Sequence, residues 1–152
     1  MIQMDRNSSR DAIKSAVYGV LDANAEVKSV LQDRIAFRDI SAFSTFPFVA
    51  IGQALDRAQS QPPDEHHLVT VNIWLRPGEE RAARKLVRIV KRALDDAKIE
   101  VPGASVLTFR HERSSLRPAP ELDALHATVR YRLILRADET EAAKRSKRIA
   151  RP

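Results

Sequence analysis

The side chains best suited to hold a metal ion are the histidines, and their spacing does not make a ligand set. His66 and His67 are neighbours in a strand-like run, so their side chains point to opposite faces and do not chelate one ion together. His111 and His126 can face each other across a hairpin, with Glu112 close by, but the fold would have to supply a further ligand. We therefore predict no metal site and expect hydrogen-bonded or solvated histidines.

The motifs of nucleophilic and nucleotide chemistry are also missing from the sequence. It contains no cysteine, which excludes disulfides, thiolate zinc sites and cysteine nucleophiles. No Gly-x-Ser-x-Gly motif occurs, and the 4 glycines lie too far apart for a P-loop or a dinucleotide fingerprint. Solvation explains adjacent carboxylates such as Asp95 and Asp96. We predict that the chain is not an enzyme and binds no cofactor.

Length and composition fit one globular domain with a charged end. The chain has 152 residues, of which 43% are hydrophobic and 30% charged. No apolar run has the length of a signal peptide or of a membrane helix, so we expect neither export nor membrane insertion. We assign residues 1–136 to a single domain and residues 137–152 to a basic, mobile tail with almost no apolar stripe.

Two segments with a clear apolar periodicity predict the central strand and the long helix of the domain. Residues 66–76 alternate strictly, with valine, isoleucine and leucine on one face, which is typical of a strand that buries one side. A Pro-Gly break follows, and apolar residues then recur at helical spacing over about residues 79–98. Before the strand, residues 7–9 and Asn24 are candidate caps for two helices that reach to about residue 31.

The remaining segments complete an α+β fold of order ααββαββ. A strand near residues 48–55 precedes the central strand, and strands near residues 105–113 and 125–136 follow the long helix. The hairpins favour a mainly antiparallel sheet of about four strands, packed by the long helix and an N-terminal helix. The predicted core consists of Val49, Ile51, Val69, Val71, Ile73, Leu86, Val90, Leu94, Val129, Tyr131 and Leu133.

The long helix carries a cationic stripe opposite its apolar one. Arginines and lysines recur there at steps of three and four residues, and the whole chain has a net charge of +6. Three interpretations remain open: a solvated outer face, a contact with an acidic protein surface, or a contact with nucleic acid phosphates. Few aromatic residues are present and none interleaves the stripe, which argues against a platform for stacking single-stranded bases.

The order of segments resembles the phage tail completion proteins, the tail terminators of long-tailed phages, prophages and gene transfer agents. The resemblance extends over about residues 9–136 and begins with the opening amphipathic helix. It continues with Asp-Arg-Ile at residues 33–35, Phe-Pro-Phe-Val-Ala-Ile-Gly at residues 46–52 and Val-Asn-Ile-Trp at residues 71–74. The segment Leu-His-Ala-Thr-Val-Arg-Tyr-Arg at residues 125–132 closes it. Asn72 stands where such proteins more usually carry an acidic residue, and the basic tail lies outside the pattern.

The resemblance implies a structural protein of virion assembly without a catalytic group. Such a protein forms a ring, typically of six copies, that closes the tail tube and joins it to the head connector. Its partners would be other copies of itself, the major tail tube protein and the head–tail connector or stopper protein. It would reside in the bacterial cytoplasm during assembly and at the head–tail junction of the finished virion.

A small nucleic-acid-binding module that uses the basic helix and the tail is the alternative. For the tail terminator, only weak and non-specific DNA binding is expected, because tight binding would oppose passage of DNA through the tail. We expect intermolecular contacts on the loops at residues 56–65 and 114–122 and on the cationic stripe. The residues predicted to make them are Gln59, Gln61, Asp64, Arg84, Arg88, Arg113 and Arg117.

Overall fold

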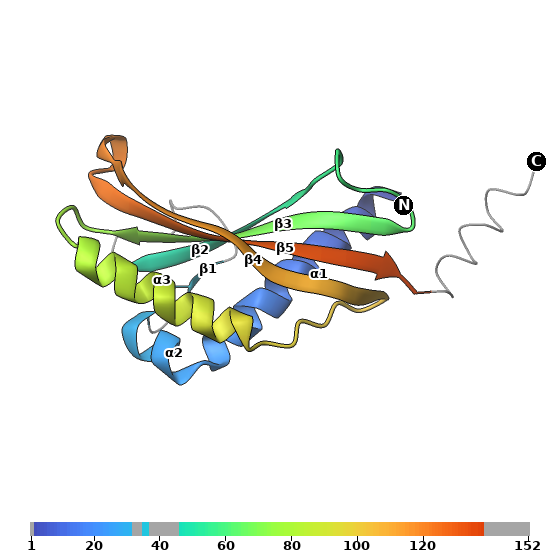
Figure 1. Ribbon diagram of the computed structural model, residues 1–152, viewed down its shortest axis with the longest axis horizontal. Coiled ribbons are helices and arrows are strands. Elements are labelled where there is room, and N and C mark those ends of the chain that lie inside the picture. Colours follow the sequence, from blue (N-terminus) through green and yellow to red (C-terminus); the bar gives the residue numbers. More distant parts are fainter. Residues whose placement is uncertain (1, 32–34, 37–45, 139–152) are drawn as a thin grey trace, which may run out of the picture.

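A twisted sheet with its helices packed on one face makes up the described part of the chain, which is residues 2–31, 35–36 and 46–138 of the computed structural model (Figure 1). The elements in chain order are α1 (Ile2–Ala23), α2 (Ala25–Leu31), β1 (Ile35–Ala36), β2 (Phe48–Leu55), β3 (Asp64–Leu75), α3 (Glu80–Asp95), β4 (Ala104–Ala119), the 3-10 turn η2 (Pro120–Leu122) and β5 (Ala124–Ala137). The predicted α+β class and order of elements are confirmed, and the two-residue strand β1 is added to them.

The sheet has the strand order β1-β2-β3-β5-β4. Strands β2, β3, β5 and β4 pair antiparallel, whereas β1 pairs parallel with β2 through Ile35 opposite Val49 and Ala36 opposite Ala50. Strand β3 is therefore central, and β4 forms one edge over its whole length. Figure 1 places the β2–β3 turn at one end of the sheet and the β4–β5 turn at the other.

The inner face of the sheet and the apolar sides of α1, α2 and α3 form one hydrophobic core. Alternation along β3 and β5 puts matching apolar residues on this face, such as Val71 opposite Val129 and Val69 opposite Tyr131. All eleven residues of the predicted core are buried, so that prediction is confirmed. A second, smaller cluster lies on the outer face near the β4–β5 turn and contains Phe46, Phe48, Trp74, Ala119 and Ala124.

The two N-terminal helices are divided at Asn24. Its side-chain Oδ1 accepts a hydrogen bond from the backbone N–H of Val27 at 3.1 Å, which confirms Asn24 as the predicted cap of α2. The expected cap at residues 7–9 is wrong, because α1 begins at Ile2 and runs through them. No glycine or proline interrupts that stretch, and serine and asparagine cost little inside a helix. None of the described helices has an apolar stretch long enough to cross a membrane.

Helix α3 is shorter than predicted, because it ends at Asp95 and not at Lys98. The N–H of Asp96 closes the last turn on the carbonyls of Arg92 and Leu94, and the chain then leaves the helix. Leaving at this point buries Ile99 and Val101 against the core.

Strand β4 extends six residues beyond its predicted end at Arg113, so most of the loop expected at residues 114–122 is strand. Pro118 does not end it, because an edge strand leaves one side of its backbone outside the ladder. His111 and His126, which could have faced each other across the hairpin, do not do so. His111 lies opposite Tyr131 and His126 opposite Arg117, because the register of the long hairpin separates them.

The buried face of β3 gives the first prediction. Val71 is fully buried, so Val71→Asp places an unpaired carboxylate in the core and should lower the free energy of unfolding by about 3 kcal/mol or more. Thr70→Asp, on the outer face of the same strand, is the matched control and should cost about 1 kcal/mol. Urea unfolding measures both, and equal stability of Val71→Asp and the parent would contradict the assigned inner face.

Candidate interaction surface

The outer face of the sheet is the side opposite the helices. No described helix covers it, and the side chains that alternate with the core residues on β3 and β5 are mostly polar. Arginines are frequent on it, and register pairs Arg110 with Arg132 and Arg113 with Arg130. Like charges opposite each other on neighbouring strands destabilise a sheet unless acidic groups balance them.

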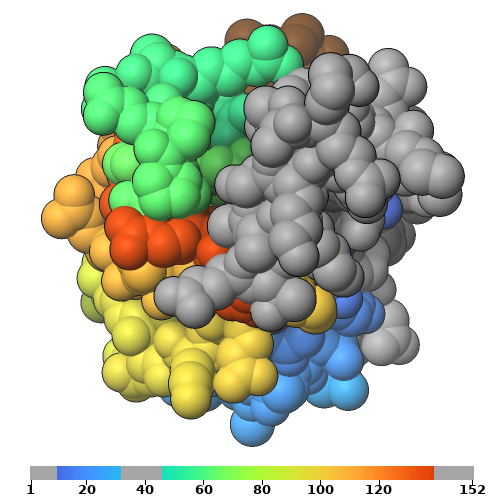
Figure 2. Space-filling model, turned by 90° about the vertical axis from the view of Figure 1, so that its right-hand side faces the viewer, coloured from blue at the N-terminus to red at the C-terminus, as the bar shows by residue number. Residues whose placement is uncertain are grey.

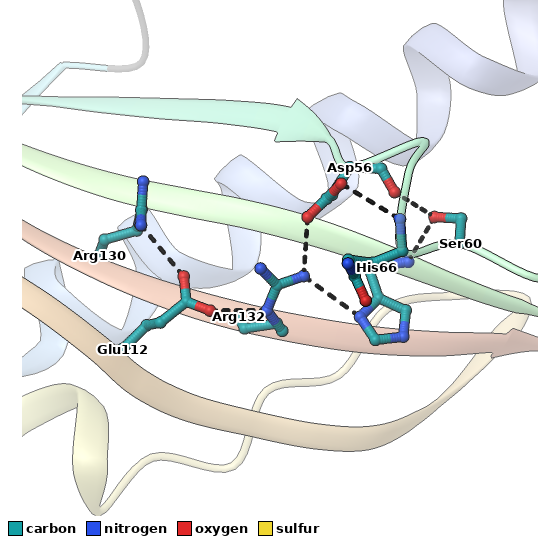
Figure 3. A network of polar contacts seen from close by, with 7 residues as sticks. Asp56, Ser60, His66, Glu112, Arg130 and Arg132 are labelled. Atoms are coloured by element: carbon teal, nitrogen blue, oxygen red, sulfur yellow. Dashed lines mark hydrogen bonds and ion pairs between the residues drawn. The ribbon is translucent and has the colours of Figure 1, made fainter.

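A polar network supplies that balance for two of these arginines (Figure 3). Arg132 donates from Nη1 to Asp56 Oδ2 at 3.0 Å and from Nε to Glu112 Oε1 at 2.7 Å. The other oxygen of Glu112 lies 3.2 Å from Nε of Arg130. Arg132 contacts both carboxylates and is therefore the centre of the network. Its side chain is only 15% exposed. One carboxylate thus serves two arginines, and a second carboxylate ties Arg132 to the end of β2.

A β-bulge brings Glu112 into this position. The register shifts between His111 and Arg113, since His111 pairs with Tyr131 and Arg113 with Arg130. The extra residue, Glu112, is thereby directed to the outer face together with its neighbour Arg113. Strand alternation alone does not reveal this placement, so the network is not predictable from the sequence pattern.

The network shifts the protonation equilibria of its members. Hydrogen bonds from Arg132 lower the pKa of Asp56 and that of Glu112, although partial desolvation opposes both shifts. The same contacts raise the pKa of Arg132, led by the hydrogen bond to Glu112. Arg132 also lies 3.2 Å from Nδ1 of His66, and because a guanidinium only donates, that nitrogen accepts. Two carboxylates, of Asp56 and Glu112, thus balance two guanidinium groups, of Arg130 and Arg132, and we call these four residues the clasp.

Hydrogen bonds between Asp56, Ser60 and His66 hold the start and the end of the β2–β3 turn together beside the clasp. The backbone N–H of Asp56 donates to the carbonyl of His66 at 2.8 Å. The hydroxyl of Ser60 donates to the carbonyl of Asp56 at 2.7 Å and accepts from the N–H of His66 at 2.9 Å. Gln59 and Gln61 are exposed on the resulting turn. A rigid base with exposed polar residues suits recognition of another surface.

The seven residues predicted to make contacts fall into three groups. Gln59, Gln61 and Asp64 lie at the end of the molecule that faces the viewer in Figure 2, where the β2–β3 turn (green) is at the top. Asp64 is bound there by Arg136, with oxygen–nitrogen distances of 2.7 and 3.2 Å, so it also fastens β3 to β5. Arg84 and Arg88 line a groove between α3 and β4. Arg113 and Arg117 lie on the outer face of β4, opposite the helices.

A basic groove runs between α3 and β4, with a volume of about 510 Å³. Its lining residues are Arg81, Arg84, Val87, Arg88, Ser114, Ser115 and Leu116. Among the described residues, the three arginines make no ion pair, whereas Lys91 binds Asp95 at 2.6 Å and Arg92 binds Glu26 at 3.3 Å. The cationic stripe is therefore neutralised near the end of α3 and open along the groove.

The ring contacts and hydrogen bonds of His126 place it in the packing of the outer face. The ring of His126 stacks on Trp74 with centroids 3.8 Å apart, and its Nε2 lies 2.8 Å from Oδ1 of Asn72. Burial lowers the pKa of His126, while Glu121 opposes the shift. The described residues hold no group of three or more metal-ligating side chains.

Tyr131 joins the sheet to the last turn of α3. Its hydroxyl donates to Oδ1 of Asp95 at 2.6 Å, and burial, followed by this hydrogen bond, raises the pKa of the phenol. Burial also opposes ionisation of Asp95, but hydrogen bonds from Lys91 and Tyr131 leave its pKa lowered. The pair therefore stays as phenol and carboxylate, and it anchors β5 to the last turn of α3.

The class of the protein follows from its similarity to a known family. A model of the family named tail completion protein gp17 matches residues 15–136, which is most of the chain. The chain therefore belongs to the tail completion protein gp17 family and is a structural protein of the phage tail class. The resemblance described above is thus confirmed.

A solved structure shows the same fold. The chain is similar to a component of a structure titled "Virion of native gene transfer agent (GTA) particle", with a TM-score of 0.74 and 15% sequence identity. The alignment covers 85% of this chain and 98% of that one. No curated protein matches the chain.

The clasp predicts a specific dependence of stability on pH. Because the folded state lowers the pKa of Asp56 and Glu112, their stabilisation is complete above the ordinary carboxyl pKa and is lost as pH falls. Arg132→Gln removes its main cause and should make unfolding free energy fall less steeply between about pH 5 and pH 3. Arg117→Gln, an exposed arginine of the same sheet face, should keep the parent's slope. Equal slopes for the parent and Arg132→Gln in urea titrations would refute the clasp.

Proposed function

We propose that the chain closes the end of a phage tail tube as a ring of copies, six in the assembled tail, and joins the tube to the head connector. The observation that carries this proposal is the family match over residues 15–136, which coincides with nearly all of the described fold. Its partners are then further copies, the major tail tube protein and the head–tail connector. The chain acts in the host cytoplasm during assembly and at the head–tail junction afterwards.

The exposed edge of the sheet supports self-association. Strand β4 is 16 residues long and pairs only with β5 among the described strands, so its other side presents free backbone groups. A contact that joins two different patches on neighbouring copies repeats around a ring when the rotation closes. The single domain therefore has surface available both for its neighbours and for the layers above and below.

The β2–β3 turn supports a contact with one of those layers. It lies at one end of the sheet, away from the basic groove, and its polar residues are exposed on a base held by Asp56 and Ser60. We assign this turn to the layer contact and the α3–β4 side to the contact between copies. The similar component of a gene transfer agent virion supports a place in a virion for this fold.

A nucleic-acid-binding module is the second candidate, and the arginines of the outer face favour it. Arg110, Arg113 and Arg117 have no ion-pair partner among the described residues, and they share one strand. Glu112 and Asp56 nevertheless neutralise part of the neighbouring charge. This leaves a surface suited to weak attraction of phosphates and without a means of reading bases.

Tube capping tests the proposed function. Replacing residues 61–63 by Gly-Ser-Gly keeps the length of the β2–β3 turn and leaves Asp56 and Ser60 in place. The variant should fold like the parent but cap fewer tubes of the matching major tail protein, because Gln61 and the two prolines beside it are lost from the contact surface. Electron microscopy counts capped tube ends, and circular dichroism checks the fold. Full capping by the folded variant would overturn the role of the turn, and absence of capping by the parent would overturn the proposed function.

DNA binding separates the two candidates. For the tail protein we expect only sequence-independent binding that falls steeply as salt rises, since counterion release drives it. Deleting residues 138–152 should weaken it further and leave folding intact. Fluorescence anisotropy with two unrelated duplexes measures both effects. Sequence-selective binding that persists at physiological salt would favour the nucleic-acid-binding module instead.

A further inference from the structure

We propose that Leu122, at the β4–β5 turn of one copy, inserts into the basic groove of a second copy of this chain. The inference rests on the proposed self-association and names the surfaces that make it. The turn presents an apolar side chain between two acidic ones, whereas the groove presents an apolar floor between arginines. We call the segment Glu121-Leu122-Asp123 the acidic tip.

The acidic tip holds Leu122 outward on a rigid base. Leu122 is 44% exposed, and the carboxylates of Glu121 and Asp123 flank it on the exposed turn. Its shape is set by the 3-10 turn, in which the N–H of Asp123 donates to the carbonyl of Pro120 at 3.1 Å. Ala119 and Ala124, on either side of the turn, are buried in the cluster that contains Trp74. A preorganised side chain loses little conformational entropy on binding.

The basic groove has the complementary pattern. Val87 and Leu116 supply apolar surface and are only half-buried in the single chain. Arg81, Arg84 and Arg88 line the same groove without an ion-pair partner among the described residues. Two carboxylates at the acidic tip thus meet three unpaired guanidinium groups, while a leucine covers the apolar floor. Complementary charges of this kind orient a contact and exclude the like-charged alternatives.

The two features of one chain do not meet each other. Leu116 in the groove and Pro120 at the start of the acidic tip lie on one continuous strand and turn, roughly 13 Å apart along an extended backbone. The strand is paired with β5 along this stretch, so the acidic tip does not fold back. An acidic tip that enters the groove must therefore come from another copy.

This contact joins different patches, which is the arrangement that builds rings. A tip-to-groove contact repeated head to tail closes when the rotation per copy divides a full turn. DNA is the less suitable occupant of the groove. Phosphates satisfy the arginines but leave Val87 and Leu116 uncovered, whereas the acidic tip satisfies both.

Cysteine cross-linking tests the contact, because the natural chain contains no cysteine. Leu122→Cys mixed with Val87→Cys should form the mixed disulfide under mild oxidation. The rate should exceed that of the matched control, Leu107→Cys with Val87→Cys, by about tenfold or more, since a bound partner raises the effective thiol concentration. Leu107 is the matched position because it is a similarly exposed leucine, at 46%, on the same strand as the groove. Equal rates for the two mixtures would overturn the inference.

Charge exchange provides a second test that does not depend on the introduced thiols. Glu121→Arg with Asp123→Arg, and separately Arg84→Glu with Arg88→Glu, should each abolish self-association, as measured by sedimentation velocity. Mixing the two folded variants restores complementary pairs at every contact and should restore association. Failure of the mixture, while each variant keeps the parent's melting temperature, would overturn the inference.

The size of the product separates this inference from the proposed ring. A chain that carries both Leu122→Cys and Val87→Cys should give a closed disulfide-linked ring by native mass spectrometry. Closed pairs would support the tip-to-groove contact and contradict the ring. Rings of the parent chain, combined with no preferred Leu122–Val87 cross-link, would support the proposed function and contradict the tip-to-groove contact.

Discussion

The burial of one sheet face beneath three helices is the constraint on which the rest of this structure depends. Val71 and Val129 face each other on that side, and their neighbours Thr70 and Arg130 face each other on the opposite side. A slip of one residue would carry an arginine into the core, so the register is strongly determined. The same register concentrates arginines on the outer face. Glu112 and Asp56 then balance Arg132 and Arg130. The clasp therefore lies on the outer face, where these arginines are brought together.

The cations of α3 that form ion pairs and those that do not lie on different parts of the helix. Lys91 and Arg92, near the end of α3, bind Asp95 and Glu26 within the chain. Arg84 and Arg88, nearer the start of the helix, have no such partner among the described residues and line a groove with apolar surface. An intramolecular ion pair satisfies a charge locally, whereas an unpaired cation beside half-buried apolar residues is available to a partner. The proposed contact between copies therefore uses this groove.

The local sequence pattern predicted the strands and helices that have a regular apolar periodicity. It did not predict features that depend on contacts between residues far apart in the sequence. The strict alternation around Val71 and the apolar stripe of α3 predicted the strand, the helix and the core. The prolines near Pro118 suggested a loop, because the edge position that tolerates them in β4 is known only from the pairing of strands. The clasp needs the bulge at Glu112 and the approach of Asp56 from another turn. Neither feature can be recognised from the local sequence.

The predicted contact residues show the same limit. Their polarity or charge is readable from the sequence, but their division among the β2–β3 turn, the α3–β4 groove and the outer face depends on topology. The central claim, that copies of this chain form a ring through distinct patches, is tested most directly by electron cryomicroscopy of the head–tail junction in particles that carry the chain. We predict one layer of copies around the channel, with the β4–β5 turn of each copy against the α3–β4 groove of the next. A single copy at the junction, or copies joined through other surfaces, would contradict this account.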